Sequence, residues 1–173
     1  ALPISYKFGK SNGWVGFSHC TIFNDGKGNW YYASQARLPK SVDNAIMLGH
    51  VRSIRWTKDG WPLVMPERYG AVPQVAITEE ELIGNWEHID LSYSYGVQKE
   101  SATMTLAADH TITEGTWKGG TWSYDAEQQI LTANGIDLYL QREVDWEASP
   151  RTPTIVYAAY GSNHKTYWGK KVK

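Results

Sequence analysis

The sequence lacks several features that mark particular classes of protein. Its 173 residues contain a single cysteine, so no disulfide can form within the chain, and only three Phe stand beside nine Trp and eleven Tyr. No apolar run approaches the roughly 18 residues of a membrane-spanning helix, and no charged start leads into a short apolar signal segment. Seventeen basic residues balance eighteen acidic ones, so the net positive charge typical of nucleic-acid-binding proteins is missing. We expect a soluble globular protein that binds neither nucleic acid nor membrane.

Helix signals are scarce, whereas strand and turn signals recur along the chain. One short helix is predicted at Thr78, where Thr78-Glu79-Glu80-Glu81 has the form of a capping box and Gly84 ends the helix. Regularly spaced antiparallel strands predict a closed barrel or a sandwich. Short apolar segments between turn clusters predict strands at 4–8, 20–24, 30–36, 51–56, 62–65, 85–93, 102–108, 121–124, 130–133, 136–142, 154–160 and 165–172.

The segment 65–74 separates two parts of the chain. It contains Pro66 and Pro73 and has no periodicity, so it is interpreted as a linker with a domain boundary near Gln74. The remaining C-terminal part, of about a hundred residues, is long enough to be a domain of its own. The N-terminal part has few strands, and we expect it to belong to a larger unit.

Carboxylate pairs are the first candidates for chemistry, because two carboxylates a few ångströms apart catalyse glycoside hydrolysis. Asp145 and Glu147 lie two residues apart, so on a strand they point to one face and can converge. Solvated charges on the outside of a barrel explain the same pair and are the favoured interpretation. Glu67 and Arg68 are expected to pair on the surface of the linker.

Patterns for a nucleophile or a metal are weaker still. Ser18-His19-Cys20 places three reactive side chains in a row, but neighbours on a strand point to opposite faces, which makes a Cys–His pair awkward. The five histidines lack the spacing of a metal site. His19 follows the apolar residues Trp14 and Phe17. It is interpreted as a packed core histidine or as a metal ligand, and the residues alone favour the core.

Several stretches, taken together, resemble one family. They are 13–20, 30–37 and 50–69, the last ending Arg-Trp-Thr-Lys-Asp-Gly-Trp-Pro-Leu-Val-Met-Pro-Glu-Arg-Tyr, and then Gly84-Asn85-Trp86-Glu87, Gly115-Thr116-Trp117, Thr121-Trp122-Ser123-Tyr124-Asp125, Asp145-Trp146-Glu147 and Tyr167-Trp168-Gly169-Lys170-Lys171-Val172. The first group resembles the end of an endo-1,5-α-L-arabinanase of glycoside hydrolase family 43. The second group resembles the lipocalin-like barrel appended to larger members of that family.

This resemblance implies an all-β chain in two parts. Residues 1–74 would be the last part of a five-bladed β-propeller, and residues 75–173 an antiparallel lipocalin-like β-barrel. The catalytic base, acid and modulating carboxylate of the family lie on upstream blades, so no catalytic residue is expected in this chain. The implied activity of the whole secreted enzyme is endo-hydrolysis of α-1,5-L-arabinofuranosyl bonds with inversion.

The resemblance also implies a role for His19. Family members have a histidine in the last blade that faces the central channel and helps to hold calcium through its water shell, and His19 matches that position. Calcium prefers oxygen ligands, so the imidazole would be one partner among waters. The implied partners are the missing N-terminal propeller polypeptide and arabinan or arabino-oligosaccharides. The alternative is a non-catalytic β-barrel module that binds carbohydrate or a small ligand.

Overall fold

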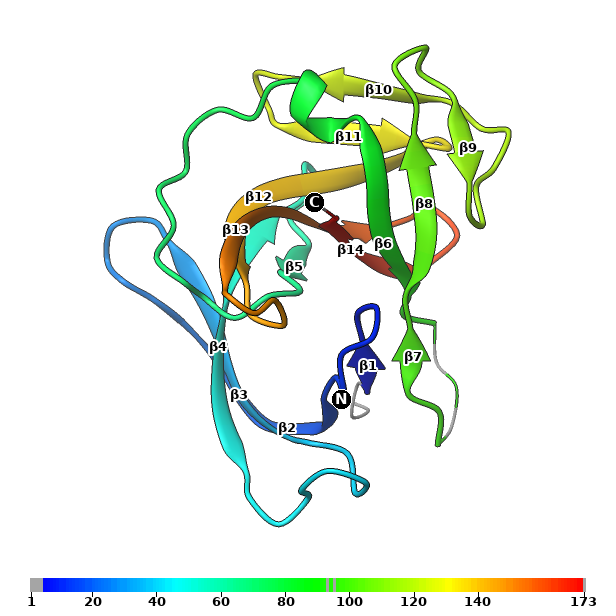
Figure 1. Ribbon diagram of the computed structural model, residues 1–173. Coiled ribbons are helices and arrows are strands. Elements are labelled where there is room, and N and C mark those ends of the chain that lie inside the picture. The colour runs from blue at the N-terminus through cyan, green and yellow to red at the C-terminus, as the bar shows by residue number, and fades with distance from the viewer. Residues whose placement is uncertain (1–4, 93, 95, 173) are drawn as a thin grey trace.

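The structure is a computed structural model that describes residues 5–92, 94 and 96–172. In these ranges the regular elements are β-strands and one 3₁₀ turn, Glu80–Leu82. No helix among them is long and apolar enough to cross a membrane. The N-terminal part is an antiparallel sheet with the order β2 (Val15–Asn24), β3 (Trp30–Arg37), β4 (Leu48–Trp56) and β5 (Pro62–Val64), shown in Figure 1.

The C-terminal part is an eight-stranded antiparallel sheet that curls into a nearly closed barrel. The end strands β9 and β10 approach each other, because Thr111 bridges Thr121 and the Ile112 amide donates to the Gly120 carbonyl at 2.9 Å. The predicted antiparallel β-barrel is therefore confirmed, and of the two predicted architectures, a closed barrel or a sandwich, the structure shows a nearly closed barrel. The strand order is β10 (Trp122–Asp125), β11 (Ile130–Ala133), β12 (Ile136–Asp145), β13 (Thr152–Tyr160), β14 (Thr166–Lys171), β6 (Gly84–Asp90), β8 (Ala102–Leu106) and β9 (Ile112–Glu114).

Large apolar side chains fill the barrel interior. On β12 the residues Ile136, Leu138 and Leu140 alternate with outward-facing neighbours, as a strand with one core face requires. The same core contains the rings of Trp86, Trp117, Trp122, Tyr157 and Tyr167, each at most 8% exposed. The interior is thus a packed core.

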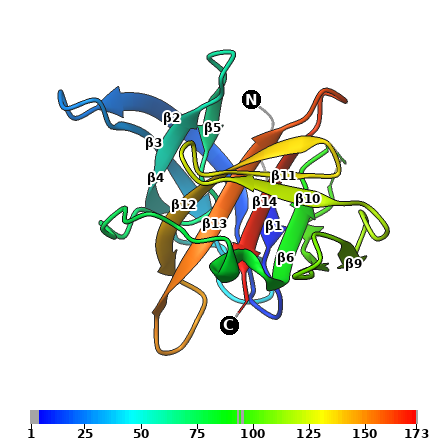
Figure 2. The same ribbon diagram turned by 90° about the horizontal axis from the view of Figure 1, so that it is seen from above.

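A second apolar core joins the two parts of the chain. The N-terminal residues Tyr6, Trp14 and Leu63 pack with Val156 and Trp168, which lie on the outer face of the barrel. The Trp168 Nε1–H donates to the Val64 carbonyl at 2.8 Å. Strand β5 lies against the barrel near β13, as the two views in Figures 1 and 2 show.

A short strand near the N-terminus adds a further link. β1 (Tyr6–Lys7) pairs in parallel with β7 (Lys99–Glu100), which lies in the connection between β6 and β8. The boundary predicted near residue 74 falls in the segment between β5 and β6. Independent folding of residues 75–173 stays a prediction.

The strand predictions differ from the structure in a few places with identifiable causes. β7 and β9 are too short to show a period, and β2 begins five residues before the predicted strand at 20–24. Gly16 and His19 have φ of +65° and +50°, and the pairing register shifts on either side of Ser18, so bulges interrupt the alternation. The predicted strand ends at residues 4 and 93 lie outside the described residues.

The predicted helix shortens to the single 3₁₀ turn. Half of the capping box forms, because the Thr78 amide donates to the Glu81 carboxylate at 2.9 Å. Ile77 and Leu82, on either side of the turn, are both buried in the barrel core. Ile83 then adopts an extended conformation that leads into β6, so the helix goes no further.

Removal of the Trp86 ring should be strongly destabilising. Trp86 is fully buried in the barrel, and its Nε1–H donates to the Leu82 carbonyl at 2.8 Å. We expect Trp86→Ala to lose about 3–5 kcal/mol of the free energy of unfolding, measured by denaturant titration. Trp61, which is 58% exposed, provides the control, and Trp61→Ala should change stability by about 0.5 kcal/mol or less. A loss below about 1 kcal/mol for Trp86→Ala would contradict its placement in the core.

Candidate functional site

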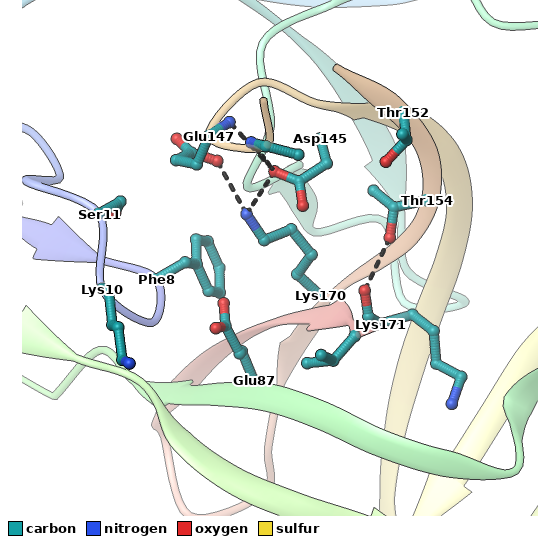
Figure 3. A pocket seen from close by; sticks show the side chains of 12 residues that line it. Phe8, Lys10, Ser11, Glu87, Asp145, Glu147, Thr152, Thr154, Lys170 and Lys171 are labelled. Atoms are coloured by element: carbon teal, nitrogen blue, oxygen red, sulfur yellow. Dashed lines mark hydrogen bonds and ion pairs between the residues drawn. The ribbon is translucent and has the colours of Figure 1, made fainter. Parts of the chain in front are cut away.

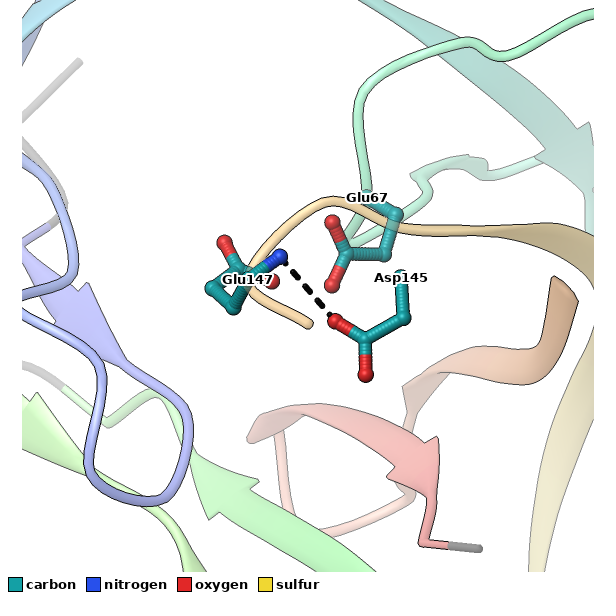
Figure 4. Close-up of side chains that lie close together, drawn as sticks. All are labelled: Glu67, Asp145 and Glu147. Atoms are coloured by element: carbon teal, nitrogen blue, oxygen red, sulfur yellow. Dashed lines mark hydrogen bonds between the residues drawn. The ribbon is translucent and has the colours of Figure 1, made fainter. Parts of the chain in front are cut away.

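A cluster of charged side chains is buried where the barrel meets the N-terminal part. The Lys170 Nζ lies 3.0 Å from Glu67 Oε1, 2.8 Å from Asp145 Oδ1 and 2.8 Å from Glu147 Oε2. Lys170 is 4% exposed and Glu67 is 2% exposed. Figure 4 shows the three carboxylates facing one another, and Figure 3 shows the ammonium between Asp145 and Glu147.

The strand alternation of β14 brings Lys170 to this position. Trp168 and Lys170 are two residues apart and share the outer face of the barrel, whereas Tyr167 belongs to the interior core. That outer face is covered by the N-terminal part, so the ammonium is withdrawn from water. A buried ammonium requires anionic partners, and Glu67, in the segment after β5, reaches it from the other side.

Asp145 and Glu147 reach the same ammonium from the end of β12. Asp145 is the last residue of β12, and its Oδ1 accepts the backbone amides of Glu147 and Ala148, both at 3.1 Å. This turn points both carboxylates toward Lys170. The interpretation of Asp145 and Glu147 as solvated surface charges is therefore wrong. They do converge, as their spacing allows, but on a lysine.

The predicted surface pair of Glu67 with Arg68 is also wrong. Glu67 is buried against Lys170, and the Arg68 guanidinium lies over the rings of Trp14, at 5.1 Å, and Trp146, at 4.6 Å. The segment after β5 lies against the barrel. Its Arg68 carbonyl accepts a hydrogen bond from the Trp146 Nε1–H at 2.7 Å. A linker on the surface would have left both charges in water.

Burial and the charges within the cluster shift the pKa values of its side chains in different directions. Burial, together with the neighbouring charge of Glu147, raises the pKa of Glu67 well above its ordinary value. Burial opposes the charge of Glu147, but hydrogen bonding from Glu67 and the Lys170 charge outweigh it and lower the pKa of Glu147. Burial likewise opposes the charge of Lys170, yet Glu67 and Glu147 raise its pKa. Glu67 and Glu147 titrate as a coupled pair, in which burial and the neighbouring charge favour protonation of Glu67 over Glu147.

This arrangement is suited to joining two parts of a protein. The ligand oxygens of Glu67, Asp145 and Glu147 lie within 4.8 Å of one another, the kind of group that could hold a metal ion. The Lys170 ammonium takes the place that a cation would have. A pocket of about 450 Å³ opens beside it (Figure 3), but Asp145 and Glu147, which line it, are engaged by Lys170. A general acid and a general base need free carboxyl groups at the substrate.

His19 lies apart from this cluster, on the bulged strand β2. Its side chain is exposed, so the interpretation as a packed core histidine is wrong for this chain. The Nδ1 atom lies 3.3 Å from Ser18 Oγ, which accepts a hydrogen bond from Gln35 Nε2 at 2.8 Å. Cys20 is exposed as well. The role of His19 as a calcium partner stays a prediction.

Two other histidines are buried, and the sequence did not single them out. His50 is 2% exposed and meets the rings of Trp14, at 4.3 Å, and Phe17, at 5.5 Å, edge-on. Burial, with the nearby Arg52 charge, lowers the pKa of His50 to about 3, and burial lowers the pKa of His88 to about 4. Both rings are neutral at physiological pH, and the His88 Nδ1 atom is hydrogen-bonded to the Tyr157 hydroxyl at 2.5 Å.

Comparison with known proteins gives consistent matches. Residues 66–169 match the family model GH43_C, described as a C-terminal lipocalin-like domain. The extracellular endo-alpha-(1->5)-L-arabinanase 2 of Bacillus subtilis (strain 168) is 23% identical over 168 residues, which cover 94% of this chain and 34% of that protein. The chain thus spans about a third of the length of this relative.

Solved structures show the same fold. The glycoside hydrolase family 43 YxiA protein of Bacillus licheniformis superposes with a TM-score of 0.82 at 24% identity, covering 97% of this chain and 38% of that one. An endo-1,5-alpha-L-arabinanase of Thermotoga petrophila RKU-1 gives 0.81 at 18% identity, covering 98% and 39%. In both cases the similarity includes the N-terminal sheet as well as the barrel.

Replacement of Glu67 by glutamine should make stability less sensitive to alkaline pH. Because the folded-state pKa of Glu67 is raised, its contribution is complete below the unfolded value and is lost as pH rises through the folded value. The amide of the substituted side chain would keep a hydrogen-bond donor without a titrating proton. We expect wild type to lose more free energy of unfolding than Glu67→Gln between mildly acidic and alkaline pH.

Denaturant titrations over a pH series measure this difference, with Glu127→Gln as control because Glu127 is exposed. The control should follow wild type across the series. Parallel pH profiles for wild type and Glu67→Gln would show that Glu67 does not carry the proton.

Proposed function

Because the chain belongs to the GH43_C family of C-terminal lipocalin-like domains, we propose that it is the C-terminal part of an arabinan-degrading glycoside hydrolase. The longer protein would hydrolyse internal α-1,5-L-arabinofuranosyl bonds with inversion. The observation that carries this proposal is the extent of the similarity to arabinanases, which covers 94% of the chain in sequence and 98% in structure. The relative from Bacillus subtilis is named extracellular, which supports secretion.

The exposed apolar surface of the N-terminal sheet supports a larger assembly. Strand β2 is an end strand of that sheet, and Ile22 and Phe23 on it are 47% and 42% exposed. On β4, Leu48 and Val51 are each 38% exposed. Unpaired strand edges and exposed apolar faces require a cover. We propose that upstream propeller blades of the same enzyme provide it, and that this sheet is the last blade.

The catalytic carboxylates would then lie on those upstream blades. An inverting glycosidase needs a general acid and a general base far enough apart to admit a water molecule, about 6.5–9.5 Å. In the described part of this chain, the three clustered carboxylates are engaged by one lysine instead. The barrel would act as a brace, because Lys170, Trp168 and the second core hold the last sheet in place.

His19 has the chemistry expected of an outer calcium partner in the longer protein. It is exposed on the end strand β2, and Ser18 beside it offers a hydroxyl oxygen. A hard cation needs several oxygen ligands, so waters and upstream groups would complete the site. When bound, calcium would reduce the repulsion between gathered carboxylates and tune their pKa values. His19 would orient the water shell from one side.

The 173-residue chain by itself should not hydrolyse arabinan. Reducing-end release from linear arabinan should remain at the buffer level, and it should appear when the longer protein is assayed under the same conditions. A denatured sample of the longer protein serves as control. If the pure chain alone hydrolysed arabinan, Asp145 and Glu147 would again be candidate catalytic residues.

In the longer protein, His19→Ala should weaken calcium binding and lower turnover. Because His19 is exposed, the melting temperature without calcium should change little. Calcium calorimetry with turnover assays tests this, and His164→Ala, another exposed histidine, is the control. Equal calcium affinity in wild type and His19→Ala would end the ligand hypothesis.

A further inference from the structure

A second pocket, which we call the junction groove, lies between the two parts of the chain. It is bordered by the start of β3, by the segment 69–74 and by the β10–β11 turn. It measures about 550 Å³ and shares no lining residue with the pocket beside Lys170. This volume falls within the range of about 300–1,000 Å³ that is typical of small-molecule sites.

Three aromatic rings line the groove and are held in position by other rings. Tyr31 stacks on Phe23 with a centroid distance of 5.3 Å, and it meets Tyr69 edge-on at 5.1 Å. Trp30 meets Trp56 edge-on at 5.6 Å. Tyr69 is 42% exposed. Rings fixed before binding lose little conformational freedom when a ligand is placed against them.

Arg55 is the basic residue of the groove, and its guanidinium is already occupied by backbone carbonyls. Nη1 donates to the carbonyls of Gln129, at 3.3 Å, and Leu140, and Nη2 donates to the Gln128 carbonyl at 3.1 Å. These bonds tie β4 to the barrel and fix the β10–β11 turn. Arg55 therefore shapes the groove and leaves little donor capacity for an anionic ligand.

Free side-chain amides supply the polar part of the lining. Gln128, Gln129 and Gln141 line the groove, and within the described ranges their amide groups make no hydrogen bond to protein. Gln74 differs, because its amide binds Val72 and Arg142. A primary amide both donates and accepts, which matches a hydroxyl group that does the same.

The charges of the lining balance, since Glu127 is the acidic residue beside Arg55. Fixed aromatic faces with free amides and no net charge suit a ligand that is uncharged, rich in hydroxyl groups and partly apolar on its ring faces. We propose that the junction groove binds a neutral oligosaccharide. Resting on the proposed function, the ligand would be a segment of arabinan.

The test is calorimetric titration of the 173-residue chain with linear α-1,5-arabinopentaose, xylopentaose, cellopentaose and trigalacturonate. We expect saturable binding of arabinopentaose with a dissociation constant of about 0.1–10 mM. Tyr69→Ala and Gln128→Ala should each weaken it by about fivefold or more. Trp61→Ala, which removes an exposed ring outside the groove, is the matched control and should bind as wild type. Melting curves confirm that each variant is folded.

The outcomes separate this proposal from the proposed function. Binding of xylopentaose or cellopentaose, weakened by the two groove variants while arabinopentaose fails to bind, would support the neutral-oligosaccharide site and count against arabinan. The groove proposal is overturned if no neutral pentaose binds, if only trigalacturonate binds, or if the groove variants bind as wild type. Arabinan hydrolysis by the longer protein would be unaffected by that result.

Discussion

The burial of the Lys170 ammonium determines how the barrel and the N-terminal sheet pack against each other. Lys170 lies on the outer face of β14, where the N-terminal part packs against the barrel, and it is buried there. Two of its carboxyl partners, Asp145 and Glu147, come from the barrel, and the third, Glu67, comes from the segment after β5. Separating the parts would remove Glu67, so the cluster specifies a single docking arrangement.

Stability and specificity come from different groups at this junction. A buried ion pair gains little net free energy, because desolvation offsets most of the attraction. The apolar contacts of Trp14, Leu63 and Trp168 supply the favourable term. The bonds from Arg55 to barrel carbonyls and the parallel pair β1–β7 add directional contacts at other points. The barrel is therefore fixed to the sheet along several edges.

Strands, which depend on the local alternation of side chains, could be predicted from the sequence. The positions of side chains whose partners are distant in the sequence could not. The barrel strands follow from the period of two and the turn residues. The first part of β2 was not predicted, because bulges at Gly16 and His19 break that period. Glu67 was misplaced because its partner lies far along the chain, near the C-terminus. One usable signal was present: Lys170 alternates with Trp168 on β14, so an ammonium on that apolar face requires an acid.

The two sheets also differ in their end strands, and this difference bears on the proposed function. The barrel joins its end strands through Thr111 and Thr121, so little of its backbone remains open to further pairing. The N-terminal sheet leaves β2 as an end strand, with Ile22 and Phe23 exposed on opposite faces. His19 lies on that strand, next to the surface that an additional chain would cover. Within the described residues, the barrel is closed and packed, whereas the open surface lies beside His19, the histidine proposed to serve the active centre.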